Sequence, residues 1–278
     1  MNVQYSLIGD SRFLPGLQVA IQSILDHGHS DRIVVYSPDP VVLTDPFLDR
    51  SGCRLVEVNA IGSGYRAYGR FFPPIVSSKV FSFESLYPDN DYVIYIDADI
   101  ILIKDFGPVL EKIETMARQV YAVGMIFRLD GTGEDVNAGL LINSGILAIP
   151  AEYATPEYVR RLASNVLSSQ SGWEEKAVSE VYDGLVNVQL FASMHRLQES
   201  TINHCTQWVH YSDPKPWIDE KEGRKTCPRW WSVYDSIISS PGSPLRSGGG
   251  AARGGGVPDA PSRGSRTPLR YMPRLRQI

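Results

Sequence analysis

Two aspartates stand two positions apart at the end of an apolar run. Residues 92–96 read YVIYI, and Asp97, Ala98 and Asp99 follow directly. Side chains alternate across an extended chain, so both carboxylates would point to the same side. Two like charges beside an apolar core raise each other's pKa unless a cation lies between them. The pair therefore predicts a site for a hard divalent cation, Mg²⁺ or Mn²⁺, with positions left for phosphate oxygens.

A second polar segment, WVHYSDPKPWI at residues 208–218, could complete such a site. Its His210 follows an apolar pair, and a neutral imidazole can add a third ligand to two carboxylates. Lys215 lies in a proline-rich turn, where its ammonium group could serve as a fixed charge for a phosphate. The alternative is a surface turn that packs Trp217, and the acidic pair upstream favours the first interpretation.

Polar residues also occur between these two segments. Asn143 and Ser144 precede Gly145, whose missing side chain would let the backbone approach a ligand. A near-duplicate Asn-Ala-Gly lies at 137–139, and one of the two is expected to be only a turn. Glu174 and Glu175 fall at a predicted helix start, where acids stabilise the helix dipole. That structural interpretation is favoured for the two glutamates on the residues alone.

Predicted strands and helices alternate along the chain. Runs of β-branched and aromatic residues predict strands, and apolar residues at helical spacing predict helices. The alternation is typical of an α/β fold with a mainly parallel sheet, in which ligands bind at the carboxyl ends of the strands. The predicted strands are Val3–Ile8, Ile33–Tyr36, Arg54–Val58, Tyr92–Ile96, Val120–Phe127 and Gly145–Ile149, and the predicted helices are residues 14–28, Ser77–Tyr87, Gly107–Met116 and Thr155–Leu167.

The composition is that of an ordinary globular protein. Of 278 residues, 43% are hydrophobic and 21% are charged, and no run reaches 18 consecutive apolar residues. The first ten residues lack the basic and apolar regions of a secretory signal. Three cysteines without metal-like spacing favour a reducing compartment. We therefore expect a cytoplasmic protein, and we expect the turn-rich aromatic segment 61–74 to be a mobile loop over the site.

The last forty residues differ sharply from the rest. Residues 239–278 contain seven arginines, no lysine, one aspartate, eight glycines and six prolines. Such a segment buries too little apolar surface to order itself. We expect one folded domain at 1–238 and a disordered tail at 239–278. The tail is either without function, even an out-of-frame translation, or a basic arm that gives peripheral contact with an anionic membrane; the first is favoured, and a specific nucleic-acid partner is not expected.

In this order, the motifs resemble the family 8 glycosyltransferases, the group of glycogenin and the bacterial lipopolysaccharide galactosyl- and glucosyltransferases. The resemblance covers about residues 3–217, and its most specific block is SSKVFSFESLYPDNDYVIYIDADIILIKD at residues 77–105. It implies a single GT-A (Rossmann-like) nucleotide-sugar-binding domain, a divalent cation that is usually Mn²⁺, a UDP-hexose donor such as UDP-glucose or UDP-galactose, and transfer with retained anomeric configuration.

The resemblance also implies roles for individual residues. Asp97, Asp99 and His210 match the metal ligands, with Ala98 between the acids. The substrate contacts implied are Ile8, Gly9, Asp10 and Phe13 for the uridine, Arg70 and Lys79 for the sugar-phosphate, Asn143, Ser144 and Gly145 for the sugar, and Lys215 for the pyrophosphate. Two departures occur: Glu175 and Lys176 replace an Asp-Gln pair that contacts the donor hexose, and the interval between His210 and Lys215 is one residue shorter, without its glycine.

Three questions of function stay open on the sequence. The acceptor is a glycan, a lipid-linked saccharide or a protein tyrosine, since fourteen tyrosines permit self-glycosylation. No catalytic nucleophile stands out, so front-face attack by the acceptor hydroxyl is favoured over a double displacement. The alternative to an enzyme is a degenerate nucleotide-sugar-binding protein without turnover. An aspartyl-phosphate phosphatase is unlike this chain, because its acidic pair would follow the first strand.

Overall fold

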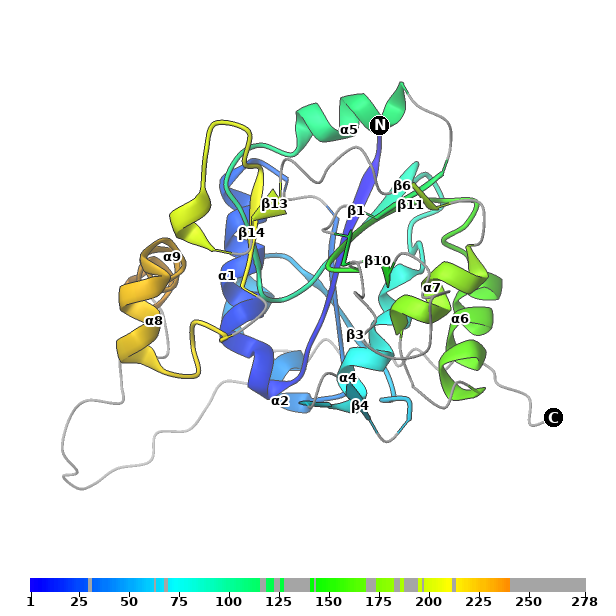
Figure 1. The fold of residues 1–278 in the computed structure, drawn as a ribbon, viewed down its shortest axis with the longest axis horizontal. Helices are drawn as coiled ribbons and strands as arrows, with labels where there is room; N and C mark the ends of the chain where they lie inside the picture. The colour runs from blue at the N-terminus through cyan, green and yellow to red at the C-terminus, as the bar shows by residue number, and fades with distance from the viewer. Residues whose placement is uncertain are drawn as a thin grey trace, which may run out of the picture.

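A mixed sheet forms the centre of the protein (Figure 1). The computed structural model describes residues 1–29, 32–62, 64–67, 70–115, 119–122, 126–127, 141–142, 144–168, 174–182, 186–187, 195–196, 198–211 and 214–240. Within these ranges the sheet has seven strands in the order β12 (Val186–Asn187), β8 (Val120–Ala122), β11 (Ile146–Pro150), β6 (Tyr92–Ile96), β1 (Val3–Ile8), β2 (Ile33–Ser37) and β3 (Arg54–Glu57). Only β11 runs antiparallel to its neighbours, so the expected α/β fold with a mainly parallel sheet is confirmed.

Helices cover both faces of this sheet, which explains its apolar strands (Figure 1). On one face, Ile94 and Ile96 pack with Leu17 and Ile21 of α1 (Leu14–Asp26), and α5 (Gly107–Glu114) joins the same core. On the other face, Tyr95 packs in a second core that contains residues of η2 (Ser78–Phe83), α6 (Pro156–Ser168) and α7 (Glu174–Val181). Alternate side chains of β6 thus enter different cores, and its carboxyl end is held from both sides.

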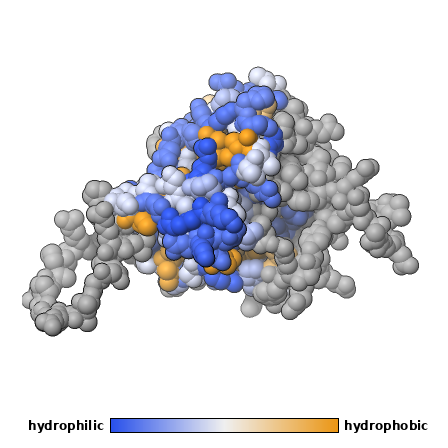
Figure 2. Space-filling model, turned by 60° about the vertical axis from the view of Figure 1, so that its left-hand side comes forward, coloured by the Kyte–Doolittle hydropathy of each residue, from blue (hydrophilic) through white to orange (hydrophobic). Residues whose placement is uncertain are grey.

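A small sheet and two C-terminal helices extend the α1 side. Strand β14 (Trp208–His210) pairs with β7 (Ile100–Leu102) and β13 (His195–Arg196). Helices α8 (Glu220–Thr226) and α9 (Pro228–Ser239) follow, and α9 contributes Trp230 and Trp231 to a core with Val19 of α1. Figure 2 shows that this side of the molecule is largely hydrophilic, with apolar residues in separate small patches.

The remaining elements are short. They are η1 (Ser11–Phe13), α2 (Pro40–Leu43), α3 (Pro46–Arg50), β4 (Tyr65–Ala67), β5 (Arg70–Phe72), α4 (Pro74–Ser77), β9 (Ile126–Phe127), β10 (Leu141–Ile142) and η4 (Glu199–Thr201). The segment predicted as a loop at 61–74 thus contains the β4–β5 hairpin. The predicted strand Val120–Phe127 is divided into β8 and β9, with residues 123–125 outside the described ranges.

The predicted helix Ser77–Tyr87 is wrong. The chain forms the four-residue α4 and then the 3₁₀ segment η2, and it becomes extended at Glu84. Serine hydroxyls compete with helical pairing here, because Ser78 Oγ donates to the Pro74 carbonyl and Ser82 Oγ donates to the Lys79 carbonyl. The tighter 3₁₀ path buries Lys79, which is 5% exposed.

The predictions about membrane-spanning segments and about the C-terminal tail concern the whole chain, and the structure describes only part of it. In the part of the chain that the structure describes, no helix is both long and apolar enough to cross a membrane. Helix α9 ends at Ser239, and the predicted tail lies outside the described residues from position 241 on. The division into a domain at 1–238 and a tail at 239–278 therefore stays a prediction.

Candidate functional site

The acidic pair lies in a tight turn at the carboxyl end of β6. The Asp97 amide donates to the Gly145 carbonyl (2.8 Å), and the Ile100 amide donates to the Asp97 carbonyl (3.1 Å). Helix α1 passes very close to this turn at Gly16. A Cβ atom on Gly16 would lie 2.5 Å from the Ala98 carbonyl oxygen and 2.6 Å from the Trp217 ring. Backbone hydrogen bonds therefore fix the turn on one side, and on the other side Gly16 allows helix α1 to pack directly against it.

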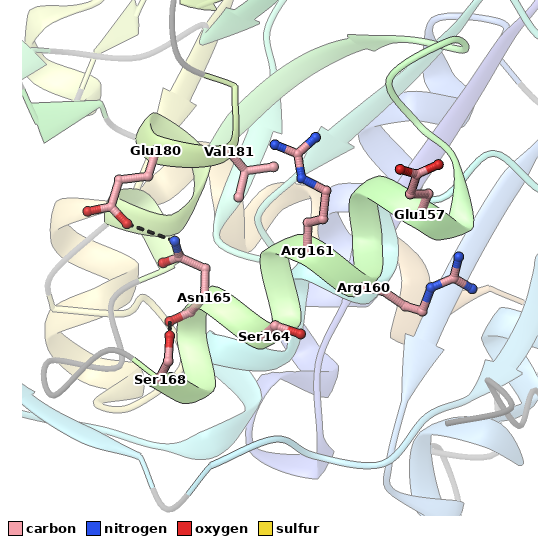
Figure 3. Close-up of a pocket in the computed structure, with 8 residues that line it drawn as sticks. All are labelled: Glu157, Arg160, Arg161, Ser164, Asn165, Ser168, Glu180 and Val181. Atoms are coloured by element: carbon pink, nitrogen blue, oxygen red, sulfur yellow. Dashed lines mark hydrogen bonds between the residues drawn. The ribbon is translucent and has the colours of Figure 1, made fainter. Parts of the chain in front are cut away.

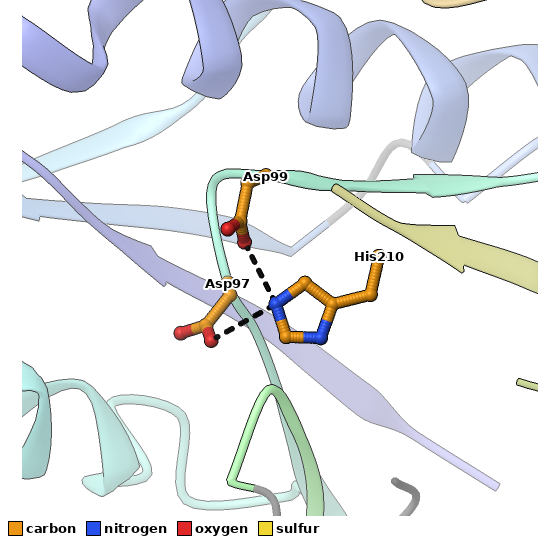
Figure 4. A group of neighbouring side chains, drawn as sticks. All are labelled: Asp97, Asp99 and His210. Atoms are coloured by element: carbon orange, nitrogen blue, oxygen red, sulfur yellow. Dashed lines mark ion pairs between the residues drawn. The ribbon is translucent and has the colours of Figure 1, made fainter. Parts of the chain in front are cut away.

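Strand pairing brings His210 to the acidic pair. In the β14–β7 register His210 lies opposite Ile100, and the Tyr211 amide donates to the Asp99 carbonyl (2.8 Å). His210 Nε2 is 3.2 Å from Asp99 Oδ1 and 3.9 Å from Asp97 Oδ2 (Figure 4). One candidate ligand atom from each of the three residues lies within 4.8 Å of the others. The residues predicted to share a metal site thus converge.

Two lysines accompany the cluster. Lys79 Nζ is 2.8 Å from Glu174 Oε1 and 3.7 Å from Asp97 Oδ1. Lys215 Nζ is ion-paired with Asp99 Oδ2, the carboxylate oxygen that does not face His210. Each aspartate therefore has its own ammonium group, and the imidazole lies next to both acids.

The two aspartates differ in acidity because their surroundings differ. Burial raises the pKa of Asp97, and the neighbouring Asp99 charge adds to that effect, although Lys79 opposes it. Burial also acts on Asp99, but Lys215 and His210 together hold the pKa of that carboxyl well below its usual range. Burial lowers the pKa of Lys79, yet the surrounding acids, Asp97 foremost, raise it overall. Lys79 therefore stays charged.

The start of α7 adds a pair of acids to the same edge. Glu174 is 3% exposed and ion-paired with Lys79, and its Oε1 is 3.5 Å from Ser144 Oγ. The Ser144 amide donates to Glu175 Oε1 (3.4 Å). Burial, followed by the charge of Glu174, raises the pKa of Glu175 to about 7. Sequence reasoning assigned Glu174 only to helix stabilisation; no local pattern shows its burial, which depends on how α7 packs.

The first strand-to-helix turn contacts the segment that carries Lys215. Gly9 donates its amide to the Tyr36 carbonyl (3.2 Å) after the buried Ile8, and Asp10 caps η1 by accepting from the Arg12 amide (3.0 Å). Trp217 Nε1 donates to the Arg12 carbonyl (2.9 Å), and its ring lies edge-on to Phe13 at a centroid distance of 6.3 Å. The turn that follows β1 and the segment that carries Lys215 are therefore in direct contact through Trp217.

A glutamate outside the cluster fixes the strand that carries His210. Tyr211 Oη donates to Glu199 Oε1 (2.5 Å), and this carboxylate also accepts from the Arg229 and Trp230 amides at the start of α9 (3.0–3.1 Å). Glu199 was not singled out from the sequence, because its partners are 12, 30 and 31 positions away and no local pattern connects them. The strand end at His210 is thus tied to the C-terminal helices.

Some predicted contacts cannot be placed. Asn143 lies outside the described residues, and the side chains of Arg70 and Lys176 are not described, although β5 and α7 include their backbones. A separate groove lies between α6 and α7 (Figure 3). It is at the far end of α7 from Glu174 and takes no part in the cluster; its lining residues are Glu157, Arg160, Arg161, Ser164, Asn165, Ser168, Glu180 and Val181.

The cluster at Asp97, Asp99 and His210 fits a divalent cation. A metal with ligand distances of about 2.0–2.3 Å needs ligand atoms no farther apart than about 4.6 Å, and the three atoms found here lie within 4.8 Å. Two carboxylates suit a hard divalent cation such as Mg²⁺ or Mn²⁺, and a neutral imidazole can add a third ligand. These residues could therefore bind a metal with only small side-chain adjustments.

Comparison with known proteins gives the fold. The sequence matches no family model and no curated protein. The structure is similar to the galactosyltransferase LgtC, solved with donor and acceptor sugar analogues (17% identity, 87% of this chain and 98% of that chain, TM-score 0.60). It is also similar to the bifunctional glycosyltransferase WbbM (16%, 86% and 52%, 0.55) and to GlyE of Streptococcus pneumoniae (15%, 86% and 64%, 0.52). At these identities the similarity establishes the GT-A glycosyltransferase fold, as expected from the sequence.

Proposed function

We propose that this protein is a metal-dependent, retaining glycosyltransferase of family 8 type that moves a hexose from a UDP-sugar to a hydroxyl acceptor. The observation that carries the proposal is the convergence of Asp97, Asp99 and His210 with Lys215 at the carboxyl edge of the sheet. In an open α/β sheet this edge is where ligands bind. LgtC, which shares the fold, was solved with donor and acceptor sugar analogues, and this supports a nucleotide-sugar as the ligand.

Each part of the site receives one part of the donor. The turn at Ile8, Gly9 and Asp10 receives the uridine, with Phe13 against the base. Lys215 receives the pyrophosphate. The residues proposed for the hexose and its phosphate are Lys79, Ser144, Gly145, Glu174 and Glu175, together with Arg70, Asn143 and Lys176, whose side chains are not described.

The chemistry follows from the charges of the site. Asp97, Asp99 and His210 would hold Mn²⁺ or Mg²⁺, which supplies positive charge to the leaving diphosphate. The Lys215 ammonium adds charge that is fixed by its short proline-bounded turn, in a position where negative charge grows as the glycosidic bond breaks. Lys79 keeps Asp97 and Glu174 in place because it pairs with both.

Transfer needs one bond to break and one to form. The bond between the anomeric carbon and the diphosphate oxygen breaks, and the acceptor oxygen bonds to the same carbon. The acceptor's proton passes to the departing phosphate oxygen. Attack on the face from which the diphosphate leaves retains the configuration and requires no enzyme nucleophile, and we assign none.

The acceptor is proposed only as a class. LgtC was solved with an acceptor sugar analogue, which supports a saccharide acceptor, free or lipid-linked. A protein tyrosine is the other candidate. A cytoplasmic protein with peripheral contact at the inner membrane face would suit a lipid-linked acceptor.

A nucleotide-sugar-binding protein without turnover is the second candidate. The features that favour it are Glu175–Lys176, where the family carries an Asp-Gln pair, and the shortened interval between His210 and Lys215. Such a protein would bind UDP-sugars in a metal-dependent manner and release no UDP.

Incubation with a panel of UDP-sugars and Mn²⁺ distinguishes these possibilities. UDP release would be measured together with the intact mass of the protein. A ladder of hexose additions means self-glycosylation, whereas UDP release without added mass points to an external acceptor or slow donor hydrolysis. Absence of metal-dependent UDP binding by calorimetry would refute the proposal itself.

A further inference from the structure

We propose that Glu174 and Glu175 make the site select donors whose sugar is uncharged and reject UDP-sugars that carry a carboxylate, such as UDP-glucuronate. The inference rests on the proposed function and assigns a specificity-determining role to two residues at the start of α7. Three observations support the inference: the position of the two glutamates, their negative charge, and the ion pairs that already occupy the neighbouring lysines.

The two glutamates line the same edge as the metal cluster. Lys79 connects them to it, because its ammonium group lies 2.8 Å from Glu174 Oε1 and 3.7 Å from Asp97 Oδ1. Ser144 connects them to the end of β6, because its amide donates to Glu175 (3.4 Å) and the next residue, Gly145, accepts from the Asp97 amide. A sugar attached to a diphosphate at the Asp97–Asp99 turn would therefore lie near both carboxylates.

The described cations at this edge are already paired. Lys79 is 5% exposed and held between Asp97 and Glu174, and Lys215 is ion-paired with Asp99. Within the described side chains of the cluster, four acids thus face two ammonium groups and one imidazole. A donor with a uronate group would bring another negative charge to carboxylates whose cations are already paired.

A neutral sugar, in contrast, can form favourable hydrogen bonds with these carboxylates. Each hydroxyl group can donate a hydrogen bond, and an ionised carboxylate can only accept. Glu175 is partly exposed, whereas Glu174 is buried, so Glu175 is the carboxylate better placed to accept from a sugar. A uronate at this position would face like charge in a partly desolvated site, which we expect to reduce affinity at least about tenfold.

The test is competitive displacement of a fluorescent UDP probe at pH 8 with Mn²⁺. UDP, UDP-glucose, UDP-galactose and UDP-glucuronate would be titrated against the wild type, Glu175→Gln and Glu180→Gln. Glutamine keeps the size of Glu175 and removes its charge. Glu180 is an exposed residue of the same helix, so its variant controls for a general change in charge.

In the wild type and Glu180→Gln, UDP-glucuronate should bind at least about tenfold more weakly than the neutral hexose donors. Glu175→Gln should reduce this difference to about threefold or less, when the affinity of each donor is compared with the affinity of the same variant for UDP. Equal affinity of UDP-glucuronate and UDP-glucose for the wild type would overturn the inference, as would an undiminished difference in Glu175→Gln whose circular dichroism matches the wild type. If UDP itself fails to bind with Mn²⁺, the proposed function has failed instead.

Discussion

Lys215 and Asp99 are 116 positions apart in the chain and form an ion pair within the group of residues that could bind a metal. Asp99 uses its other oxygen to face His210. Under the proposed function the same carboxylate must ligate a metal and the same lysine must reach a phosphate. The ion pair therefore holds two binding groups that separate when the ligands bind.

Removing the lysine should affect metal and nucleotide in opposite directions. Without the competing ammonium group, Lys215→Met should bind Mn²⁺ about three- to tenfold more tightly in the absence of nucleotide. UDP affinity in saturating Mn²⁺ should fall about tenfold, because a phosphate contact is lost. Electron paramagnetic resonance of free Mn²⁺ measures the first effect and calorimetry the second.

Lys221→Met supplies the control, since Lys221 is exposed on α8. It should change neither affinity. An unchanged Mn²⁺ affinity in Lys215→Met would mean that the ion pair with Asp99 does not compete with the metal in solution.

The imidazole of His210 should contribute strongly to Mn²⁺ affinity. His210→Ala should raise the Mn²⁺ concentration needed for half-maximal UDP binding by about 10- to 100-fold, because one of three protein ligands is lost. Protons compete with a metal for an imidazole, so Mn²⁺ affinity of the wild type should fall as the solution is acidified. The variant should show a weaker dependence on pH. Calorimetric titrations with Mn²⁺ between pH 5.5 and 8 test both effects, and identical pH profiles would exclude His210 as a ligand.

Glu175 should make stability depend on pH in the absence of ligands. Its pKa is raised from 4.5 to about 7 in the folded protein, so the folded state binds this proton more tightly than the unfolded chain. The resulting stabilisation is complete below 4.5 and is lost as the pH rises through about 7. Glu175→Gln should therefore match the wild type near pH 4 and exceed its free energy of unfolding by about 2 kcal/mol at pH 8, a value reduced for partial exposure.

Urea denaturation in EDTA at several pH values measures this difference. Glu180→Gln should follow the wild-type curve throughout. A constant offset between Glu175→Gln and the wild type would show that the two differ in packing, not in the titration of the carboxyl group.

Gly16 should tolerate no side chain. A Cβ atom would come within 2.5 Å of the Ala98 carbonyl oxygen, a backbone atom in the middle of the acidic turn. Gly16→Ala should lower the free energy of unfolding by about 1–3 kcal/mol through overpacking and displace the turn, despite the better helix propensity of alanine. Mn²⁺ affinity should fall with it.

Thermal denaturation and Mn²⁺ binding measure the two consequences of Gly16→Ala. Gln22→Ala, on the same helix but away from the turn, should change stability by less than about 1 kcal/mol and leave Mn²⁺ binding intact. A Gly16→Ala variant as stable as the wild type would mean that α1 can move away from the turn at little cost.

The sequence predicted the central strands from their β-branched and aromatic residues. Tyr92–Ile96 is an uninterrupted apolar run, whereas Val3–Ile8 contains Gln4 and Ser6; both strands have the predicted bounds. The region after Ser77 was predicted wrongly because its periodicity suits a helix, while its serine hydroxyls bond to the backbone instead.

The candidate site was predictable where the residue type itself indicates chemistry. An acidic pair behind a buried strand is unusual enough to mark Asp97 and Asp99 without knowledge of the fold. Glu174 and Glu199 carry no such mark. An acid in the first turn of a helix normally faces solvent. Glu174 instead pairs with Lys79, and Glu199 accepts hydrogen bonds from Tyr211 and from the Trp230 amide. Only the folded structure shows these contacts.

The tie between Glu199 and the start of α9 has a consequence for the order in which the site arises during synthesis. Asp97 and Asp99 leave the ribosome more than a hundred residues before His210 and Lys215, and Glu199 finds its amide partners at Arg229 and Trp230 later still. A growing chain therefore carries its acids for some time without the imidazole and ammonium group that complete the site. Translation adds about 5–20 residues per second, so this interval lasts several seconds. Because His210 and Lys215 are made last, the cluster can form only when synthesis of the folded region is nearly finished.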